Sequence, residues 1–203
     1  MASNDIQTIF EDFEFNMWFG TFGNGLIQMP TFKFNFFKPE QASDIKSVLI
    51  DSSEYIWLGT NKGLLQYYPE NKNKTTLYES SNGFVNDAVN ALMMDKNGKI
   101  WIGCETKGIY IFDPKTNKFE NFSKNNKLLS LSINCITQTK TGMIIVGTKE
   151  GVYFINPETK KIDLLTTMEG LLHNNARYIF CDSKKRIWFC SDGTPPYFLQ
   201  NDE

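Results

Sequence analysis

An internal repeat of about 43 residues limits what this chain can fold into more than any other feature of its sequence. Five short apolar segments align on one anchor position, and successive anchors are separated by 39, 44, 44 and 43 residues. The anchors are Trp18, Trp57, Trp101, Ile145 and Trp188. Self-similarity at a fixed period indicates an array in which each unit packs on its neighbours.

Other marks recur in phase with the anchors. An alternating apolar stretch, such as 45–50, ends at a polar turn, and an apolar segment with the anchor follows the turn. The residue six positions before each anchor is an Asp in four units and a Thr in one: Asp12, Asp51, Asp95, Thr139 and Asp182. A Gly followed by an aliphatic residue comes six or seven positions after four anchors: Gly25, Gly63, Gly108 and Gly151.

Each unit predicts four short strands joined by turns rich in Gly, Asn, Asp and Pro. Four-stranded units at a fixed period are the blades of a β-propeller. No stretch sustains the 3.6-residue apolar period of a helical solenoid. We therefore predict an all-β chain that forms one propeller domain over 1–203, with four full blades and a partial fifth. The expected blades are about 6–44, 45–87, 88–132, 133–175 and 176–203.

Two segments, 45–69 and 100–114, relate the repeat to a known family. The first ends Ile-Trp-Leu-Gly-Thr-Asn-Lys-Gly-Leu-Leu-Gln-Tyr-Tyr-Pro, and the second is nearly as close to the same motif. In these residues the chain resembles the two-component regulator propeller repeat. It departs from that pattern at Ile145, which replaces Trp, at Cys190, which replaces Gly, and in having few units with no kinase or linker segment.

The resemblance implies a ligand-sensing role in signal transduction. Such repeats are similar to those in the extracytoplasmic regions of bacterial hybrid two-component regulators, which are often linked to polysaccharide use. We therefore expect a ligand-binding propeller whose partner is an oligosaccharide. The resemblance implies a periplasmic location as part of a larger sensor. No signal peptide is recognisable at 1–5, so a stand-alone protein would be cytoplasmic.

Composition and charge exclude several classes of function. The formal net charge of −2 offers no basic footprint for a nucleic acid. Apolar runs such as 143–146 are far shorter than the ~20 residues that cross a bilayer, so we expect no membrane insertion by this chain.

The cysteines have no C-x-x-C spacing, and we predict free thiols, no bound metal and no cofactor. They are Cys104, Cys135, Cys181 and Cys190.

Repeated residues are poor candidates for chemistry, because catalysis needs different groups that converge on one point. One Trp per unit at a fixed strand position fits packing between blades better than sugar stacking. One Asp per unit at a fixed turn position fits turn capping better than acid–base work. We therefore predict no catalytic residues and no enzyme activity.

The candidate ligand site lies on loops where the repeat breaks. In a four-stranded blade, the loop into the first strand and the loop between the second and third strands lie at the same end, and ligands bind where such loops converge. This end offers Asn-rich, mixed-charge side chains that suit a polar ligand such as a glycan. They are Asn24, Asn61, Lys62, Asn86, Asp87, Glu105, Lys107, Lys149, Glu150, His173, Asn174, Arg177 and Asp192.

Two other functions stay open. One is a propeller enzyme, a lyase or hydrolase acting on carbohydrate, for which the suggestive set is Glu105, Glu150, His173 and Asp192. The other is a structural platform for protein–protein interaction. The sequence also leaves closure open, since the fifth unit allows only three strands. We expect either a closed ring of five blades or an open array whose apolar end faces pair with a second copy.

Overall fold

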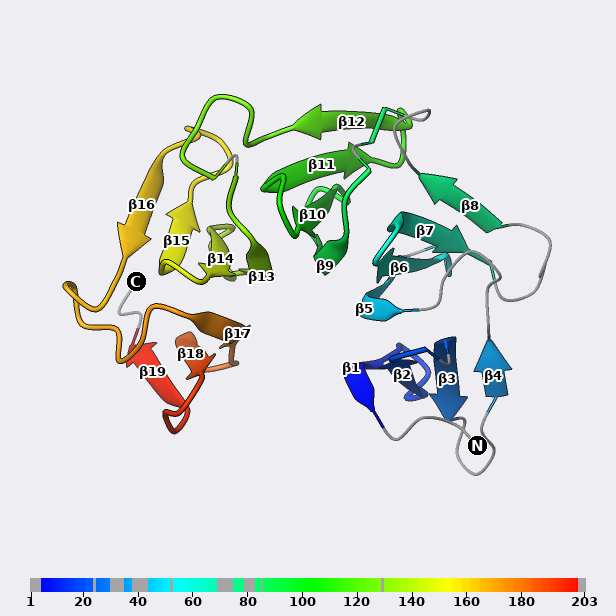
Figure 1. Cartoon of the computed structure of the whole chain (residues 1–203), viewed down its shortest axis with the longest axis horizontal. Coiled ribbons are helices and arrows are strands. Elements are labelled where there is room, and N and C mark those ends of the chain that lie inside the picture. Colours follow the sequence, from blue (N-terminus) through cyan, green and yellow to red (C-terminus); the bar gives the residue numbers. More distant parts are fainter. Residues whose placement is uncertain are drawn as a thin grey trace. The chain divides into compact units, whose positions relative to one another are not determined.

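The computed structural model describes residues 5–23, 25–29, 35–37, 44–51, 53–68, 75–78, 83–84, 86–128 and 130–200. Its strands form five antiparallel sheets, each a propeller blade, and the described residues contain no helix (Figure 1). None of them therefore forms a helix able to cross a membrane. The all-β propeller fold predicted from the repeat is confirmed.

The strands follow the sequence order within each blade. The first blade contains β1 (Ile6–Glu11), β2 (Met17–Thr21), β3 (Gly25–Met29) and β4 (Asn35–Phe37). The second contains β5 (Ile45–Ile50), β6 (Ile56–Thr60), β7 (Gly63–Tyr67) and β8 (Thr75–Tyr78). The third contains β9 (Val89–Met94), β10 (Ile100–Cys104), β11 (Ile109–Asp113) and β12 (Lys118–Asn121).

The fourth blade contains β13 (Ile133–Gln138), β14 (Ile144–Thr148), β15 (Val152–Ile155) and β16 (Ile162–Leu165). The fifth contains β17 (Ala176–Cys181), β18 (Arg186–Ser191) and β19 (Tyr197–Gln200). Of the five blades, the described residues thus give four strands to four blades and three strands to the last. The expected count of four full blades and a partial fifth is therefore better stated as five blades of three or four strands.

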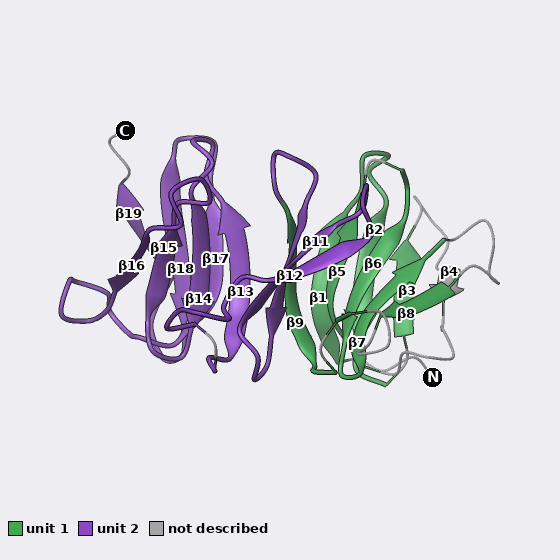
Figure 2. Ribbon diagram, turned by 90° about the horizontal axis from the view of Figure 1, so that it is seen from above, with its two compact units in different colours: residues 1–94 green, residues 95–203 purple. Residues whose placement is uncertain are grey.

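The chain divides into two compact units, residues 1–94 and 95–203, and the division falls between β9 and β10 (Figure 2). Inside each unit, the first strands of successive blades lie side by side, as β5 does with β1 and β9, and β17 does with β13 (Figure 1). The expectation of one domain over 1–203 stays a prediction.

Each Asp position holds its hairpin together through one carboxylate. In the third blade, Asp95 Oδ1 accepts hydrogen bonds from the backbone N–H groups of Asn97 at 2.8 Å and Lys99 at 3.0 Å. Its Oδ2 accepts a third from the indole Nε1–H of Trp101 at 3.0 Å. The same three bonds recur at Asp12, Asp51 and Asp182. Turn capping by these aspartates is therefore confirmed, and the bond to the indole adds a link to the second strand.

At Asp12 and Asp182 these bonds lower the pKa of the carboxyl group and favour its charged form. Burial raises the pKa of Asp12, but hydrogen bonds from Trp18, Asn16 and Glu14 outweigh it and keep that pKa below its ordinary value. The Trp188 indole N–H, with help from Arg186, lowers the pKa of Asp182 well below its usual range. A depressed pKa in the folded state stabilises the fold above the ordinary aspartate pKa of about 3.9, and this stabilisation is lost as the pH falls through the folded value.

The tryptophans are packing residues. Trp57 and Trp101 are each 1% exposed, and Trp18 is also buried. Trp18 packs with Ile45, Val48 and Leu58 of the following blade, which is contact between blades rather than a free stacking platform. The prediction that the repeated Trp supports blade packing is confirmed.

Glycine two positions after the anchor lets neighbouring blades approach closely. A Cβ on Gly59 would lie 2.7 Å from the carbonyl oxygen of Val89, at the start of the next blade. A Cβ on Gly147 would lie 2.9 Å from the carbonyl oxygen of Ala176 and 2.5 Å from Cys135 Sγ. Backbone cannot yield cheaply at such distances, so the repeated Gly is a requirement of blade packing.

The four cysteines are free in the structure. Cys190 pairs across the hairpin with Tyr178, and Cys181 pairs with Ile187, so the two thiols of this blade are not opposite one another. Burial raises the pKa of the Cys135 thiol to about 12, so this thiol is neutral at physiological pH.

We predict that Asp95→Ala lowers the free energy of unfolding by about 3 kcal/mol, because it leaves a buried indole N–H and two turn N–H groups without their acceptor. Thr139→Ala, at the same turn position in the fourth blade, removes a hydroxyl that accepts one backbone bond, from Met143, and should cost about 1 kcal/mol. Urea unfolding measures both values. Equal losses in the two variants would contradict the role given to the carboxylate.

Candidate ligand-binding site at the loop end of the blades

The loop end is the end of each blade that carries the loop into the first strand and the loop between the second and third strands. A Gly-Thr-x-x-Gly sequence shapes the second of these loops. The Thr60 hydroxyl donates to the Gly63 carbonyl oxygen at 2.9 Å and accepts the Lys62 N–H at 3.1 Å. The Thr148 hydroxyl makes the same bonds to Gly151 and Glu150. This internal bonding turns the two residues between Thr and Gly towards solvent.

In the first unit, one of the predicted site residues, Asn61, is paired at this end. Asn61 Nδ2 donates to Asp44 Oδ2 at 3.0 Å, which joins the loop after β6 to the residue before β5. The Asp87 carboxylate accepts the N–H of Ala88 at 3.0 Å, and Lys62 and Asn86 are exposed. Asn24, also predicted for the site, lies outside the described residues.

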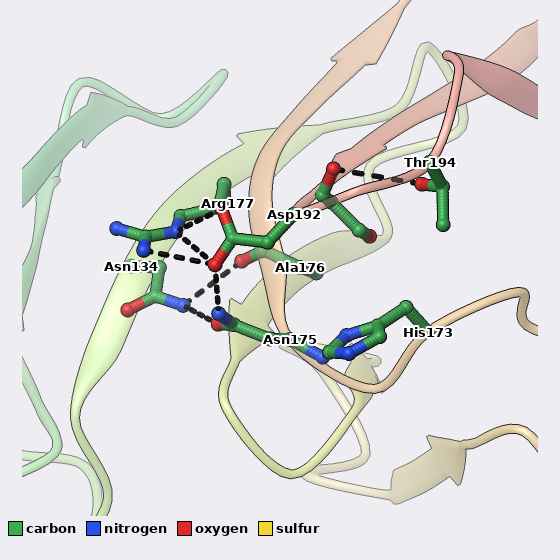
Figure 3. A network of polar contacts seen from close by, with 8 residues as sticks. Asn134, His173, Asn175, Ala176, Arg177, Asp192 and Thr194 are labelled. Atoms are coloured by element: carbon green, nitrogen blue, oxygen red, sulfur yellow. Dashed lines mark hydrogen bonds and ion pairs between the residues drawn. The ribbon is translucent and has the colours of Figure 1, made fainter.

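In the second unit, a larger polar network forms on the fifth blade (Figure 3). Arg177 Nε donates to Asp192 Oδ1 at 2.9 Å, and Arg177 Nη2 donates to Asp192 Oδ2 at 2.9 Å. Asn175 Nδ2 also donates to Asp192 Oδ2, at 2.9 Å. The loop before β17 and the loop after β18 therefore meet as the sequence predicted, with Asp192 as their common acceptor.

The network continues onto the fourth blade through Asn134. Its Nδ2 donates to Asn175 Oδ1 at 3.1 Å and to the Ala176 carbonyl oxygen at 3.0 Å. Figure 3 shows the amides of Asn134 and Asn175 and the guanidinium of Arg177 gathered around the Asp192 carboxylate. The group thus spans two blades of one unit, and we call these four residues the Arg177 cluster.

His173 borders the Arg177 cluster, and Asn174 lies beside it. The N–H of Asn175 donates to His173 Nδ1 at 3.0 Å, which fixes the imidazole beside Asn175. Asn174 instead turns away, and its Oδ1 accepts the Thr167 N–H at 2.8 Å. Of the four residues suggestive of an enzyme, His173 and Asp192 are linked through Asn175, whose backbone N–H donates to His173 and whose Nδ2 donates to Asp192.

Four other predicted residues lie on exposed loops outside the Arg177 cluster. None of their side chains bonds to it in the described part of the chain. They are Glu105, Lys107, Lys149 and Glu150.

Sequence reasoning predicted Arg177 but missed its equivalents in the other blades, the polar residues that follow the first residue of each first strand. Arg177 belongs to this set and is part of β17 rather than of the preceding loop. Lys46 and Asn90 are neighbours in the first unit, where Lys46 Nζ donates to Asn90 Oδ1 at 3.1 Å. The five residues each stand eleven positions before an anchor, a signal present in the alignment: Gln7, Lys46, Asn90, Asn134 and Arg177.

A β-bulge explains why these side chains point out of the sheet. The register slips between the first and third residues of β1, β5, β13 and β17, so the second residue has no partner on the neighbouring strand. A bulge bends the strand and turns the extra side chain out of the pleat. Polar groups can therefore gather at the loop end without disturbing the apolar packing of the blade.

The ion pair in the Arg177 cluster is accessible. The side chains of Arg177 and Asp192 are 64% and 54% exposed. The hydrogen bonds from Arg177, assisted by its charge and by Asn175, hold the pKa of Asp192 below its ordinary value, and the same bonds raise the pKa of Arg177. Both groups are thus charged at physiological pH. They present a planar guanidinium and a carboxylate to solvent, and among the described residues no cluster of His, Cys, Asp and Glu could hold a metal ion.

Residues 83–106 match the family model described as two component regulator propeller. The match covers β9, β10 and the Asp95–Trp101 pair, and it confirms the resemblance seen in the repeat. No curated protein sequence matches the chain at a significant level.

Solved propellers share the fold. The extracellular domain ascribed to a one-component system of B. thetaiotaomicron is 23% identical, with a TM-score of 0.77, over 95% of this chain and 27% of that one. The extracellular domain ascribed to a hybrid two-component system of the same organism is 23% identical, with a TM-score of 0.75, over 93% and 26%. The chain therefore spans about a quarter of the length of these domains.

A propeller enzyme is similar at lower identity. Virginiamycin B lyase from Staphylococcus aureus is 12% identical, with a TM-score of 0.74, over 98% of this chain and 71% of that one. All three comparisons establish the propeller fold, which resembles extracellular sensor regions of two-component systems. At these identities the fold alone is shared, and function has to be argued from the site.

We predict that the Asp192 carboxylate titrates with a midpoint below the ordinary aspartate value of about 3.9. A carbon-detected NMR titration of its carboxyl group measures the midpoint. In Arg177→Gln the midpoint should rise towards the ordinary value, because the donors that favour the charged form are lost. An unshifted midpoint in both proteins would show that the pair does not form in solution.

Proposed function

We propose that the chain is the ligand-binding part of a sensor, and that the Arg177 cluster recognises an oligosaccharide. The observation that supports this most is the exposed, doubly bonded ion pair between Arg177 and Asp192, flanked by the amides of Asn134 and Asn175. Exposed ion pairs contribute little to stability, so folding alone gives little reason for this arrangement.

The chemistry of the cluster suits a neutral, hydroxyl-rich ligand. A guanidinium and two amides supply N–H donors, and a carboxylate and amide oxygens supply acceptors. Vicinal sugar hydroxyls both donate and accept, so one sugar ring can bond to a donor and an acceptor of the cluster together. The charges of Arg177 and Asp192 compensate each other, which favours neutral over strongly charged ligands.

The sensor role rests on the resemblance of the repeat and on the fold shared with extracellular domains of B. thetaiotaomicron regulators. In this proposal the chain lies outside the cytoplasm, in the periplasm, and passes ligand occupancy to a signalling partner. A carbohydrate lyase or hydrolase is the competing proposal, since His173 borders the cluster and a lyase shares the fold. A third proposal is an interaction platform with no small ligand.

The test is binding of the whole chain to a panel of plant, host and bacterial oligosaccharides, followed by calorimetry with the best neutral hit. We expect Arg177→Ala and Asn134→Ala each to weaken binding by about tenfold, since each removes bonds to a charged or amide group. Lys149→Ala, on an exposed loop outside the cluster, should leave the affinity unchanged. Absence of any hit, or equal affinity in all variants, would contradict the proposal.

The same ligand separates sensor from enzyme. The oligosaccharide that binds best should stay intact when it is incubated with the original chain, and it should also stay intact with His173→Ala. Turnover that is lost in His173→Ala would instead establish the enzyme.

We further propose that a second copy of the chain covers the apolar outer faces of the terminal blades. In the first unit, Ile6 and Ile9 are 48% and 57% exposed, whereas their equivalents in the second blade, Ile45 and Val48, are 0% and 8% exposed. In the second unit, the opposite face of the fifth blade presents Tyr178, Phe180 and Phe198, all exposed. These positions are the two halves of the contact that joins successive blades, so they are complementary.

Light scattering over a concentration series tests this proposal. We expect a dimer or larger species that Phe180→Ser converts to monomer, while Phe13→Ser, which changes a more exposed Phe in a hairpin turn, leaves the mass unchanged. A strict monomer at all concentrations would contradict association with a second copy.

A further inference from the structure

The fourth blade lacks both members of the pair that holds the other hairpins. Thr139 stands in the Asp position and Ile145 in the Trp position. The Thr139 hydroxyl accepts the Met143 N–H at 3.0 Å and lies 2.8 Å from the Thr141 hydroxyl. The Thr141 N–H is equivalent to the Asn97 N–H, which donates to the Asp95 carboxylate in the third blade. Within the described residues, the Thr141 N–H has no acceptor. The turn therefore keeps the backbone donor but lacks the carboxylate that accepts its hydrogen bond in the other hairpins.

A cavity of about 80 Å³ lies at this turn. One side is the fourth-blade hairpin turn, and the other is formed by β17, the following turn and β18. Ile187 lines the cavity and belongs to the same apolar cluster as Ile145. The Ile145 side chain is smaller than the Trp side chain at this position in the other blades. The cavity is lined by Gln138, Thr139, Lys140, Thr141, Cys181, Asp182, Lys185 and Ile187.

Two cations and one carboxylate line the cavity. Lys140 and Lys185 are both exposed, and Lys140 Nζ reaches across to the Ser183 carbonyl oxygen at 3.1 Å. The one carboxylate of the lining, Asp182, already accepts bonds from Trp188 at 3.0 Å and Arg186 at 2.6 Å. Burial raises the pKa of the Cys181 thiol, so this group adds no negative charge.

The surrounding turns add to the positive potential. The hairpin turns 95–99, 139–143 and 182–186 of the second unit contain six Lys or Arg and two Asp, whereas turns 12–16 and 51–55 of the first unit contain four Asp or Glu and no Lys or Arg. Lys96 extends over Gly142, where an added Cβ would lie 2.9 Å from its Nζ. A local excess of one charge raises the concentration of counter-ions at the surface.

We propose that this cavity binds a small oxyanion, a phosphate, sulfate or carboxylate group, in place of the missing aspartate carboxylate. Its oxygens accept bonds from the Thr141 N–H, the Thr139 and Thr141 hydroxyls, and the ammonium groups of Lys140 and Lys185. The cavity has room for several water molecules, which is the space that a tetrahedral oxyanion needs. This site lies at the hairpin-turn end of the blades, whereas the Arg177 cluster lies at the loop end, and the two are independent.

Binding is tested by NMR titration of the full chain with sulfate, phosphate and acetate at constant ionic strength, with chloride as the reference salt. N-acetylglucosamine 6-sulfate reports whether the same group is accepted when a sugar carries it. We expect saturable shifts of the Thr141 and Lys140 amides with at least one oxyanion and none with chloride. Shifts that are absent, or that increase without saturation in every salt, overturn the proposal.

Variants locate the site. The double variant Lys140→Gln and Lys185→Gln should weaken binding by about tenfold or more, because it removes two charged donors. Lys184→Gln removes a neighbouring cation that does not line the cavity and should change the affinity less than twofold. If the double variant and Lys184→Gln weaken binding equally, the anion is attracted by the overall positive charge and not bound in the cavity, which overturns the proposal.

A repaired blade gives the decisive comparison. Thr139→Asp combined with Ile145→Trp restores the carboxylate and the indole of the other blades, so it should abolish oxyanion binding while the protein stays folded. Its urea midpoint should equal or exceed that of the original chain, which excludes unfolding as the cause. Undiminished binding by this folded variant would show that the anion does not occupy the carboxylate position.

Discussion

One aspartate carboxylate per hairpin, hydrogen-bonded to two turn N–H groups and to an indole N–H, is the interaction on which this structure depends. At Asp95 the three bonds are 2.8, 3.0 and 3.0 Å long. They fix the turn and orient the Trp101 ring, which is buried and packs against Phe122. Glycine two residues later lets the next blade approach to backbone contact, as at Gly59. The turn aspartate, the anchor tryptophan and the following glycine therefore depend on one another, which explains why they recur together in the repeat.

This use of the repeated residues determines where ligand chemistry can occur. The anchor residues are packed inside the blades, and the turn carboxylates already accept at least three hydrogen bonds each. A ligand therefore has to bind to side chains that the repeat does not use. At the loop end, the bulge in β17 frees the Arg177 side chain, which meets Asp192 there. At the opposite end, the change to Thr139 and Ile145 removes a carboxylate and an indole together and a cavity lies beside them. Both proposed sites lie where a blade departs from the shared pattern.

The sequence was sufficient to predict the strands, the blades, the capping role of aspartates such as Asp51 and the packing role of Trp57, because each follows from local spacing. It also placed the loops carrying Asp192 and His173 at the same end of the blade. It did not predict the bond from aspartate to indole, because six residues along the chain become neighbours only across a folded hairpin. The bulge residues Lys46 and Asn134 were missed because they were counted as part of alternating strands. A register shift changes the direction of a side chain without any change in the apolar pattern.

Hydrogen exchange of the indole N–H groups tests the central claim most directly, because those protons form the bonds to the carboxylates. In D2O, the indole protons of Trp57 and Trp101 should exchange at least about a hundredfold more slowly than in a free peptide, since exchange requires the blade to open. In Asp95→Ala, the Trp101 proton should lose most of this protection while the Trp57 proton keeps it. Free-peptide rates for both protons in the original chain would contradict the account.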